Sequence, residues 1–231
     1  MDIFYLIVNF FVRGGVFMFP ILFVATIGAA IAIERYITLT RMRASNRAAW
    51  SRIEPVLANG DFEKARELTG KDDTAISRLL SMGLALQGAV RRRDDVEKAM
   101  DESLLEIIPR MEKRTHYLSA LANIGMLTGL LGTVIGLISA FASIAQANPA
   151  EKASLLAASI SVAMNNTASG LLCAITLLLA HMFLEAKTTK LIDSLEIAAV
   201  KFLNSVVERR QDVDAGDEHP APRGRTAHGI A

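Results

Sequence analysis

Three stretches of the chain contain no charged residue. They run from Gly14 to Ile33, from Tyr117 to Ala150 and from Ala153 to Ala180, over about 20, 34 and 28 residues respectively. A bilayer core about 30 Å thick is crossed by roughly 20 apolar residues in helical conformation. Buried helices of soluble proteins seldom stay uncharged over such lengths, so the pattern predicts membrane-spanning helices. We place these spans at residues 14–38, 116–147 and 153–186.

The basic residues around the spans predict an orientation. Arginines and lysines cluster after the first span, before the second and after the third: Arg35, Arg41, Arg43, Arg47, Arg52, Arg110, Lys113, Arg114, Lys187 and Lys190. The link between the second and third spans, "QANPAEK", has a single lysine. The positive-inside rule therefore places residues 39–115 and the C-terminus in the cytoplasm and the N-terminus outside. The first span is too long for a signal peptide and lacks a small-residue cleavage site after it.

The segments outside the spans carry helix signals, so we expect an all-α protein. Residues 1–13 are apolar but too short to span, which favours an interfacial helix on the outer face. In the cytoplasmic region 39–115, Asp61 is a candidate N-cap with Gly70 as the stop, and Asp73 or Thr74 caps a second helix.

One long helix is expected from residue 91 into the second span, bent at Pro109. Its apolar stripe consists of Val96, Met100, Leu104 and Ile107. The third span should continue as a cytoplasmic helix over 187–210, with apolar residues at Leu191, Leu195, Ala198, Phe202 and Val206. Residues 211–231 have the composition of a disordered tail. Arg91–Arg93 form a basic run that favours a solvated turn over a lipid-binding patch.

Small residues form a stripe on one face of each of the last two spans. In the second span these are Gly125, Gly129, Gly132 and Gly136, and in the third they are Ser159, Ala163, Asn166, Gly170 and Cys173. Their spacing of three and four residues keeps each set on one helix face. In lipid, where no hydrophobic drive brings helices together, close backbone approach across small residues supplies the packing.

The third span also carries amides and a hydroxyl at membrane depth, Asn165, Asn166 and Thr167. Polar groups in hydrocarbon need partners or water. They either hydrogen-bond between helices of a bundle or line an ion path, and the residues alone favour neither. The second and third spans contain no Asp, Glu, Lys or Arg at that depth; His181 and Glu185 lie near the cytoplasmic end. A proton carrier must titrate, so another chain would have to supply the acid.

Composition excludes several functional classes. The net charge of +1 gives no indication of nucleic-acid binding, and the only cysteine, Cys173, cannot form an internal disulfide. No nucleophile–base pair, metal-ligand cluster or phosphate-binding loop is recognisable. We therefore expect no enzyme activity, no cofactor and no metal site.

Three blocks of sequence resemble the ExbB/TolQ branch of the MotA/TolQ/ExbB proton channel family. They are "GGVFMFPILFVATIGAAIAIERYITL", "LTGLLGTVIGLISAF" and "ISVAMNNTASGLLCAI", each at one span. Their order, spacing and loop sizes agree with the family over roughly residues 12–205. The block in the second span is the most specific of the three.

The resemblance implies a homopentamer in the bacterial inner membrane. Single-span subunits of the ExbD/TolR type would thread its pore, each with an aspartate that takes up and releases protons. Thr133 and Thr167 match the family's pore threonines, and Asn165 and Asn166 would add to the lining. Proton flow would then drive work on the periplasmic side, through a TonB-like protein for import or a TolA-like protein for envelope maintenance. Membrane lipids are the other expected partners.

The chain departs from the family pattern in the third span. Val162 stands where ExbB proteins often have a glutamate, and Thr176 stands where they have a proline. Asparagine and threonine oxygens would also suit Na⁺, so a Na⁺-driven motor is an alternative. Two others are a flagellar-type stator, disfavoured because that class has four spans, and a passive membrane scaffold.

Overall fold

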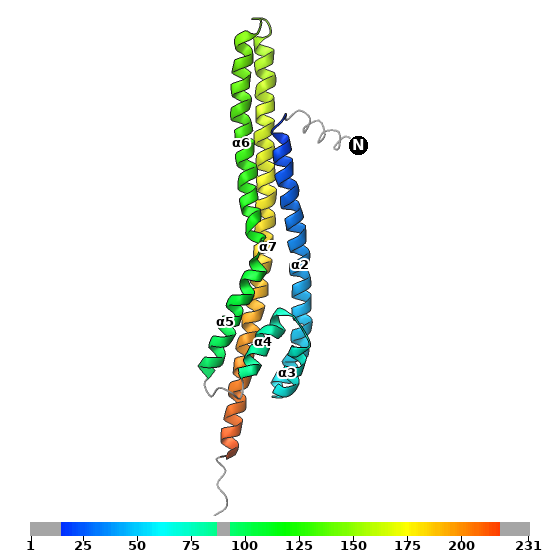
Figure 1. The fold of residues 1–231 in the computed structure, drawn as a ribbon, viewed down its shortest axis with the longest axis vertical. Helices are drawn as coiled ribbons and strands as arrows, with labels where there is room; N and C mark the ends of the chain where they lie inside the picture. The colour runs from blue at the N-terminus through cyan, green and yellow to red at the C-terminus, as the bar shows by residue number, and fades with distance from the viewer. Residues whose placement is uncertain (1–14, 87–92, 218–231) are drawn as a thin grey trace, which may run out of the picture. The chain divides into compact units, whose positions relative to one another are not determined.

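The computed structural model describes residues 15–86 and 93–217 of the chain (Figure 1). The helix expected at 1–13, Arg91 and Arg92 of the basic run, and residues 218–231 of the expected tail lie outside this part. The elements within it are α-helices: α2 (Met18–Ala58), α3 (Phe62–Gly70), α4 (Ala75–Leu86), α5 (Arg93–Glu112), α6 (Thr115–Gln146) and α7 (Lys152–Asp217). The expected all-α fold is confirmed. Three of the described segments are long and apolar enough to cross a membrane.

The chain divides into two compact units, and α2, α5 and α7 each contribute to both. The first unit comprises Met1–Arg41 and Pro109–Leu191. The second comprises Met42–Ile108 and Ile192–Ala231. The first contains the apolar stretches, and the second contains most of the predicted cytoplasmic region.

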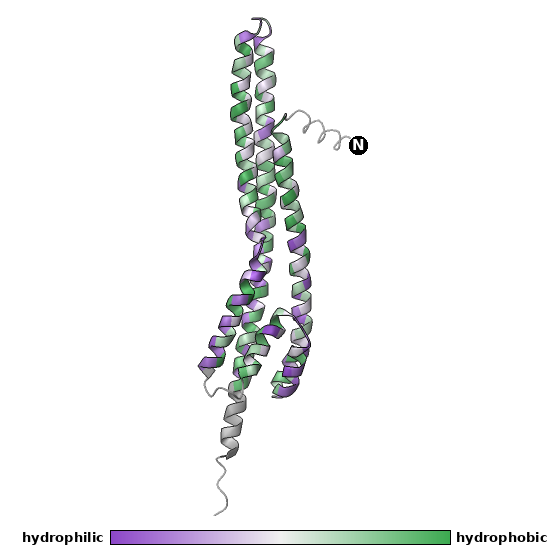
Figure 2. Cartoon of the chain, in the orientation of Figure 1, coloured by the Kyte–Doolittle hydropathy of each residue, from purple (hydrophilic) through white to green (hydrophobic). Residues whose placement is uncertain are grey.

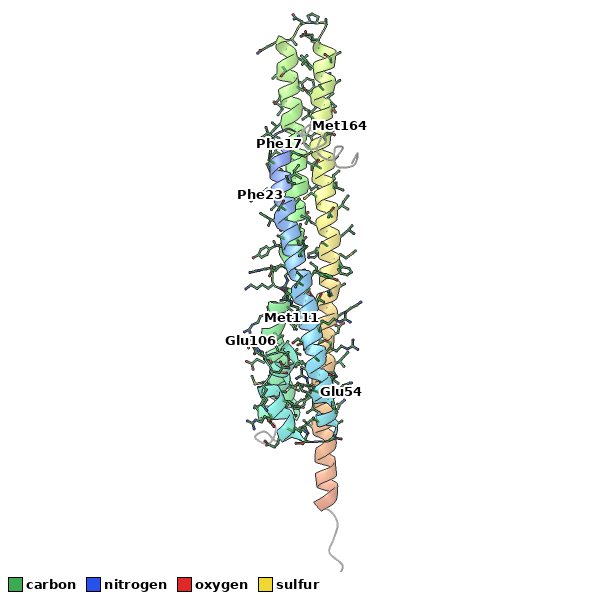
Figure 3. The ribbon with its side chains drawn as sticks, turned by 90° about the vertical axis from the view of Figure 1, so that its right-hand side faces the viewer. Phe17, Phe23, Glu54, Glu106, Met111 and Met164 are labelled. Atoms are coloured by element: carbon green, nitrogen blue, oxygen red, sulfur yellow. The ribbon has the colours of Figure 1, made fainter. Side chains whose placement is uncertain are left out.

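In the first unit, α6 and α7 run antiparallel and are joined by a short connection at residues 147–151, with the first part of α2 beside them (Figure 1). Many large apolar side chains on these helices face outward, including Phe23 and Met164, with exposed fractions of 68% and 65% (Figure 3). Figure 2, which colours the chain by residue hydropathy, shows these helices largely in green, the colour of hydrophobic residues. An aqueous protein would bury such residues, whereas a bilayer provides them with an apolar environment.

The second unit has an ordinary hydrophobic core. The stripe predicted on α5 is buried, as are the predicted apolar positions on the extension of α7 from Leu195 to Val206. Leu191, at the end of the first unit, is buried as well. Phe202, Leu79 and Leu80 are fully buried. Gly83 of α4 lies directly against Phe202, because a Cβ added there would approach its ring within 2.5 Å. Fully burying each such side chain stabilises a fold by about 1.5–3 kcal/mol.

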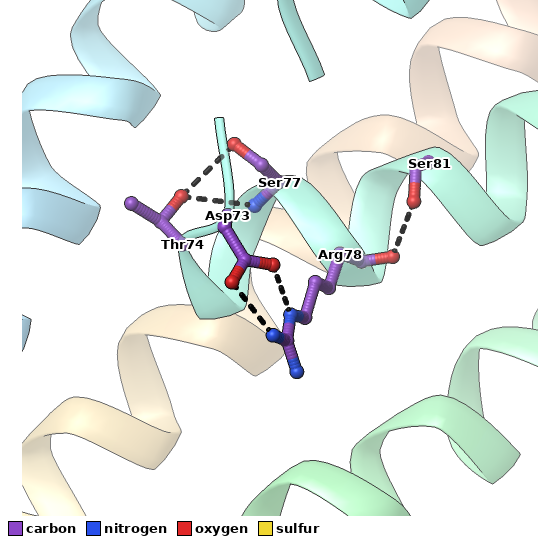
Figure 4. A network of polar contacts seen from close by, with 5 residues as sticks. All are labelled: Asp73, Thr74, Ser77, Arg78 and Ser81. Carbon is purple, nitrogen blue, oxygen red and sulfur yellow. Dashed lines mark hydrogen bonds and ion pairs between the residues drawn. The ribbon is translucent and has the colours of Figure 1, made fainter. Parts of the chain in front are cut away.

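Helix caps in the second unit follow the sequence signals. The Asp61 carboxylate accepts a hydrogen bond from the Lys64 amide at 3.1 Å, which confirms the predicted start of α3. For α4 the sequence left two candidates. Thr74 caps the helix, since its hydroxyl oxygen accepts from the Ser77 amide at 3.3 Å, while Asp73 pairs with the Arg78 guanidinium (Figure 4).

The single helix expected from residue 91 into the second span is wrong. Helix α5 continues past Pro109 to Glu112, and α6 starts at Thr115. Between them, Arg114 has the left-handed φ of 68°. Such a residue ends a helix, though glycine is the usual choice there. The interruption is stabilised from α2, where Arg35 donates to the Met111 carbonyl and Glu34 pairs with Arg114.

The third long helix extends further than expected. Helix α7 ends at Asp217, so residues 211–217, which composition assigns to the tail, have helical backbone. Helix propagation adds one hydrogen bond for each residue ordered, so a long helix extends readily over polar residues at its end.

Candidate functional site

Glycines bring the backbones of α6 and α7 into direct contact. A Cβ added at Gly129 would lie 2.8 Å from the Asn166 carbonyl oxygen and 2.9 Å from the Gly170 Cα. Non-bonded atoms do not approach so closely, so neither Gly129 nor Gly170 leaves room for a side chain. The next two stripe positions are less crowded, since the nearest atoms to an added Cβ lie at 3.0 Å for Gly132 and 3.2 Å for Gly136.

The close approach places Thr133 of α6 beside Thr167 of α7. Their hydroxyl groups are hydrogen-bonded to each other. Both also lie within reach of the Gly129 carbonyl oxygen, Thr133 at 3.2 Å and Thr167 at 3.4 Å. These two residues, hereafter the threonine pair, are half-buried in this chain. Each hydroxyl therefore has a lone pair or proton that can exchange partners at the edge of the helix contact.

The two asparagines occupy different environments. Asn166 is 2% exposed and packs against Gly132, and its side-chain oxygen has no hydrogen-bond partner among the described residues. An unpaired buried acceptor is costly, so this oxygen is a place for a water molecule or an outside donor. Asn165 is half-buried and precedes Thr167 by two positions, which puts it about 160° away around the helix. The structure thus brings Asn166 to the threonine pair but leaves Asn165 on another face.

A polar pocket lies further along α7 in the same unit. Its volume is about 420 Å³, and it is lined by Glu112, Thr115, His116, His181, Glu185 and Thr188 among others. The His181 Nδ1 lies 3.6 Å from a Glu185 carboxylate oxygen. The sequence places these two residues near the end of the third span but does not bring Glu112 and His116 to them. Among the described residues, no cluster of three or more His, Cys, Asp or Glu has the arrangement of a metal site.

The opposite face of α7 contacts α2. The Lys187 ammonium lies 3.8 Å from the centre of the Tyr36 ring and 2.5 Å from the Thr40 hydroxyl oxygen. Phe183 stacks on the same ring with centroids 6.4 Å apart. Aromatic and lysine side chains of this kind are typical of a membrane–water boundary.

These features define a class of protein. Three long apolar helices, outward-facing apolar side chains and glycine-mediated backbone contact describe a helical multi-pass membrane protein. Comparison with known proteins then identifies the family. A model of the MotA/TolQ/ExbB proton channel family matches residues 71–197.

Named relatives agree with that match. The biopolymer transport protein ExbB of Neisseria gonorrhoeae is 31% identical over 207 residues, which cover 82% of this chain and 91% of the relative. An ExbB-like protein of Synechocystis is 29% identical over 191 residues, 79% of this chain and 72% of the relative. An ExbB homolog of Methanothermobacter thermautotrophicus is 26% identical over 197 residues, 83% of this chain and 67% of the relative. The chain belongs to the MotA/TolQ/ExbB proton channel family.

Proposed function

We propose that this chain is the channel-forming subunit of an ion-driven motor that couples the proton gradient of a bacterial inner membrane to work in the periplasm. The observation that supports this most strongly is the threonine pair. Two hydroxyls that share one carbonyl acceptor at the edge of a tight helix contact are suited to passing hydrogen bonds to a titrating group. A purely structural contact between glycine stripes would not need them.

The titrating group belongs to a second polypeptide. Neither α6 nor α7 carries an acid at the depth of the threonine pair, and threonine does not titrate. We infer a single-span partner of the ExbD/TolR type, whose membrane aspartate meets Thr133 and Thr167 in a pore formed by several copies of this chain. A homopentamer with the N-terminus in the periplasm and the C-terminus in the cytoplasm fits the family and the charge distribution.

The work performed is either TonB-dependent import or maintenance of the envelope through a Tol-Pal type system. The name of the Neisseria gonorrhoeae relative, a biopolymer transport protein, supports the first. A flagellar-type stator fits less well, because the described residues contain three candidate spans rather than four. No enzymatic role is proposed.

Reconstitution tests the proposal directly. The chain, co-purified with a single-span subunit of the ExbD/TolR type, is placed in vesicles with a pH-sensitive dye inside. We expect proton flux only when both subunits are present, and its loss in Thr133→Val. Thr133→Ser, which keeps the hydroxyl, is the matched control and should conduct.

Three outcomes contradict the proposal. Flux through this chain alone at the rate of the full assembly would show that no borrowed acid is needed. A complex of both subunits that shows no proton flux would favour the passive membrane scaffold. Flux that stops when Na⁺ is replaced by choline, at constant pH, would instead assign a Na⁺-driven motor.

A further inference from the structure

We propose that the polar pocket is the cytoplasmic mouth of the ion path, and that His181 and Glu185 exchange protons there between the path and the cytoplasm. The inference rests on the proposed function and on the orientation given with it. It assigns a role to titratable residues that the threonine pair does not explain.

The first support is the chemistry of the pocket lining. Two imidazoles and two carboxylates, from His116, His181, Glu112 and Glu185, surround one cavity. Imidazole is the side chain that gains and loses protons near neutral pH, and a carboxylate beside it accepts what it releases. The His181 side chain is 19% exposed and that of Glu185 is 66% exposed. The pair therefore connects a sheltered position to bulk water.

The second support is helical register. Glu185 follows Thr167 by 18 residues, which is five full turns, so both lie on the same face of α7 about 27 Å apart. Thr115 precedes Thr133 by the same interval on α6. Because α6 and α7 run antiparallel, Thr115 and Glu185 lie toward the same end of the helix pair. The face of the two helices that holds the threonine pair therefore also holds the pocket, five turns further along. His181 lies between the two levels and within about 40° of that face.

The third support is the position of α2. Lys187 and Phe183, which contact Tyr36 of α2, lie about 160° around α7 from Glu185. The pocket therefore opens on the side of α7 that α2 does not cover. In an assembly whose pore is lined by the threonine pair, that side faces the pore.

The charged and titratable groups around His181 come from four helices. Glu185 lies on its own helix, Glu112 and His116 face it from α5 and α6, and Arg35 of α2 reaches Thr115 at the wall of the pocket, 3.4 Å from its hydroxyl. Lys187 points to α2 instead. The pocket thus surrounds His181 with carboxylate and imidazole side chains, and the guanidinium of Arg35 is engaged with Thr115 at its wall.

The relay needs no co-reactant. His181 accepts a proton on one ring nitrogen from water in the path and releases the proton of the other nitrogen toward Glu185. The Nδ1 atom and the carboxylate oxygen lie 3.6 Å apart, and rotation of the exposed Glu185 side chain brings them to hydrogen-bond distance for this second transfer. Glu185 then releases the proton to the cytoplasm. The imidazole of His181 is left as its other tautomer, and rotation of the ring or proton exchange with water restores the starting tautomer.

The test compares variants of the reconstituted complex with its single-span partner. His181→Gln/Glu185→Gln should lower proton flux about tenfold, less than the 10²-fold typical of positioned proton-transfer groups, because water at the mouth partly replaces them. The remaining flux should lose its dependence on the pH of the cytoplasmic buffer. Imidazole added to that buffer should restore proton flux in the His181→Ala variant. Glu196→Gln, an exposed change on the same helix outside the pocket, is the matched control and should conduct as the wild type.

Co-purification with the partner verifies assembly, and the single variant Glu185→Gln, at an exposed position, provides a second test should His181 variants fail to assemble. Wild-type flux in both the double variant and Glu185→Gln overturns this inference. That result leaves the proposed function standing, because Thr133→Val tests the proposed function separately. Reduced flux with an unchanged pH profile and no imidazole rescue also overturns it, because a structural defect would behave in that way. A wild-type complex without partner-dependent flux removes the proposed function, and this inference with it.

Discussion

The guanidinium of Arg35 on α2 donates a hydrogen bond to the backbone carbonyl of Met111, in the last turn of α5. Its Nε also lies 3.4 Å from the hydroxyl of Thr115, the first residue of α6. Arg35 is 4% exposed although it is charged. One side chain thus satisfies groups on both sides of the interruption between α5 and α6, where a helix end would otherwise leave carbonyls unpaired.

Arg35→Met should therefore destabilise the first unit. The substitution keeps the apolar stem but leaves the Met111 carbonyl and Thr115 hydroxyl without a donor, at a cost of about 2–3 kcal/mol. We expect a lower thermal unfolding midpoint in detergent, followed by circular dichroism. Arg41→Met, an exposed arginine on the same helix, should change it little. An equal loss in the two variants would show that Arg35 contributes only its charge.

Much of the fold is predictable from residue patterns, because apolar runs, caps and periodic stripes act over a few turns. The start of α3 at Asp61 and the burial of Val96 and Met100 are of this kind. The break before α6 is not. Arginine is a rare choice for a left-handed position, and the partner that stabilises this break, Arg35, lies 79 residues earlier in the chain.

The candidate site follows the same division. The spacing of Gly129 and the presence of Thr133 and Thr167 are visible in the sequence, and their roles in conduction stay predictions. The pocket forms where the end of α5 and the start of α6 lie beside α7, so only the structure brings Glu112 and His116 to His181. The sequence nevertheless indicates that Thr167 and Glu185 share a helix face, since they are separated by five whole turns.

Glycine substitutions should separate tight from loose helix contact. Gly129→Ala places a methyl group against backbone atoms at 2.8 and 2.9 Å, which cannot rotate away, so α6 and α7 must move apart. When this variant is produced with the partner subunit, we expect the peak of the assembled complex to be lost in size-exclusion chromatography. Gly136→Ala meets the Ala163 methyl at 3.2 Å, with backbone atoms no nearer than 3.6 Å, and should assemble nearly normally. Equal behaviour of the two variants would contradict the idea that backbone contact at Gly129 is required.

The pair of Asp73 and Arg78 in the second unit predicts a pH effect. The hydrogen-bonded Arg78 guanidinium, 2.7 and 2.8 Å from the two carboxylate oxygens, holds the pKa of Asp73 below its usual value (Figure 4). Since the folded-state pKa is lowered, the pair contributes stability at pH values above the unfolded pKa of about 3.9 and loses it as the pH falls through the folded value. The pair is exposed, so the contribution is small.

An NMR titration of carboxyl-labelled protein in detergent tests this directly. In Arg78→Met the midpoint of Asp73 should move up toward about 3.9, while in Lys71→Met, a change outside the pair, it should stay low. A midpoint for Asp73 that is the same with and without Arg78 would show that the pair does not form in solution.

The threonine pair should behave as one unit in conduction. Thr133 and Thr167 are hydrogen-bonded to each other and share the Gly129 carbonyl, so removing either hydroxyl breaks the same connection. Groups that act together show strongly non-additive effects when both are removed. We expect Thr133→Val and Thr167→Val each to reduce proton flux of the reconstituted complex. The flux of the double variant should be no lower than that of the single variant with the lower flux. Thr128→Val removes a hydroxyl whose hydrogen bond among the described residues stays within its own helix, to the Ile124 carbonyl at 2.7 Å, and this variant should conduct normally. If the two effects instead multiply, each hydroxyl contacts the ion path separately, and the direct bond between Thr133 and Thr167 has no part in conduction.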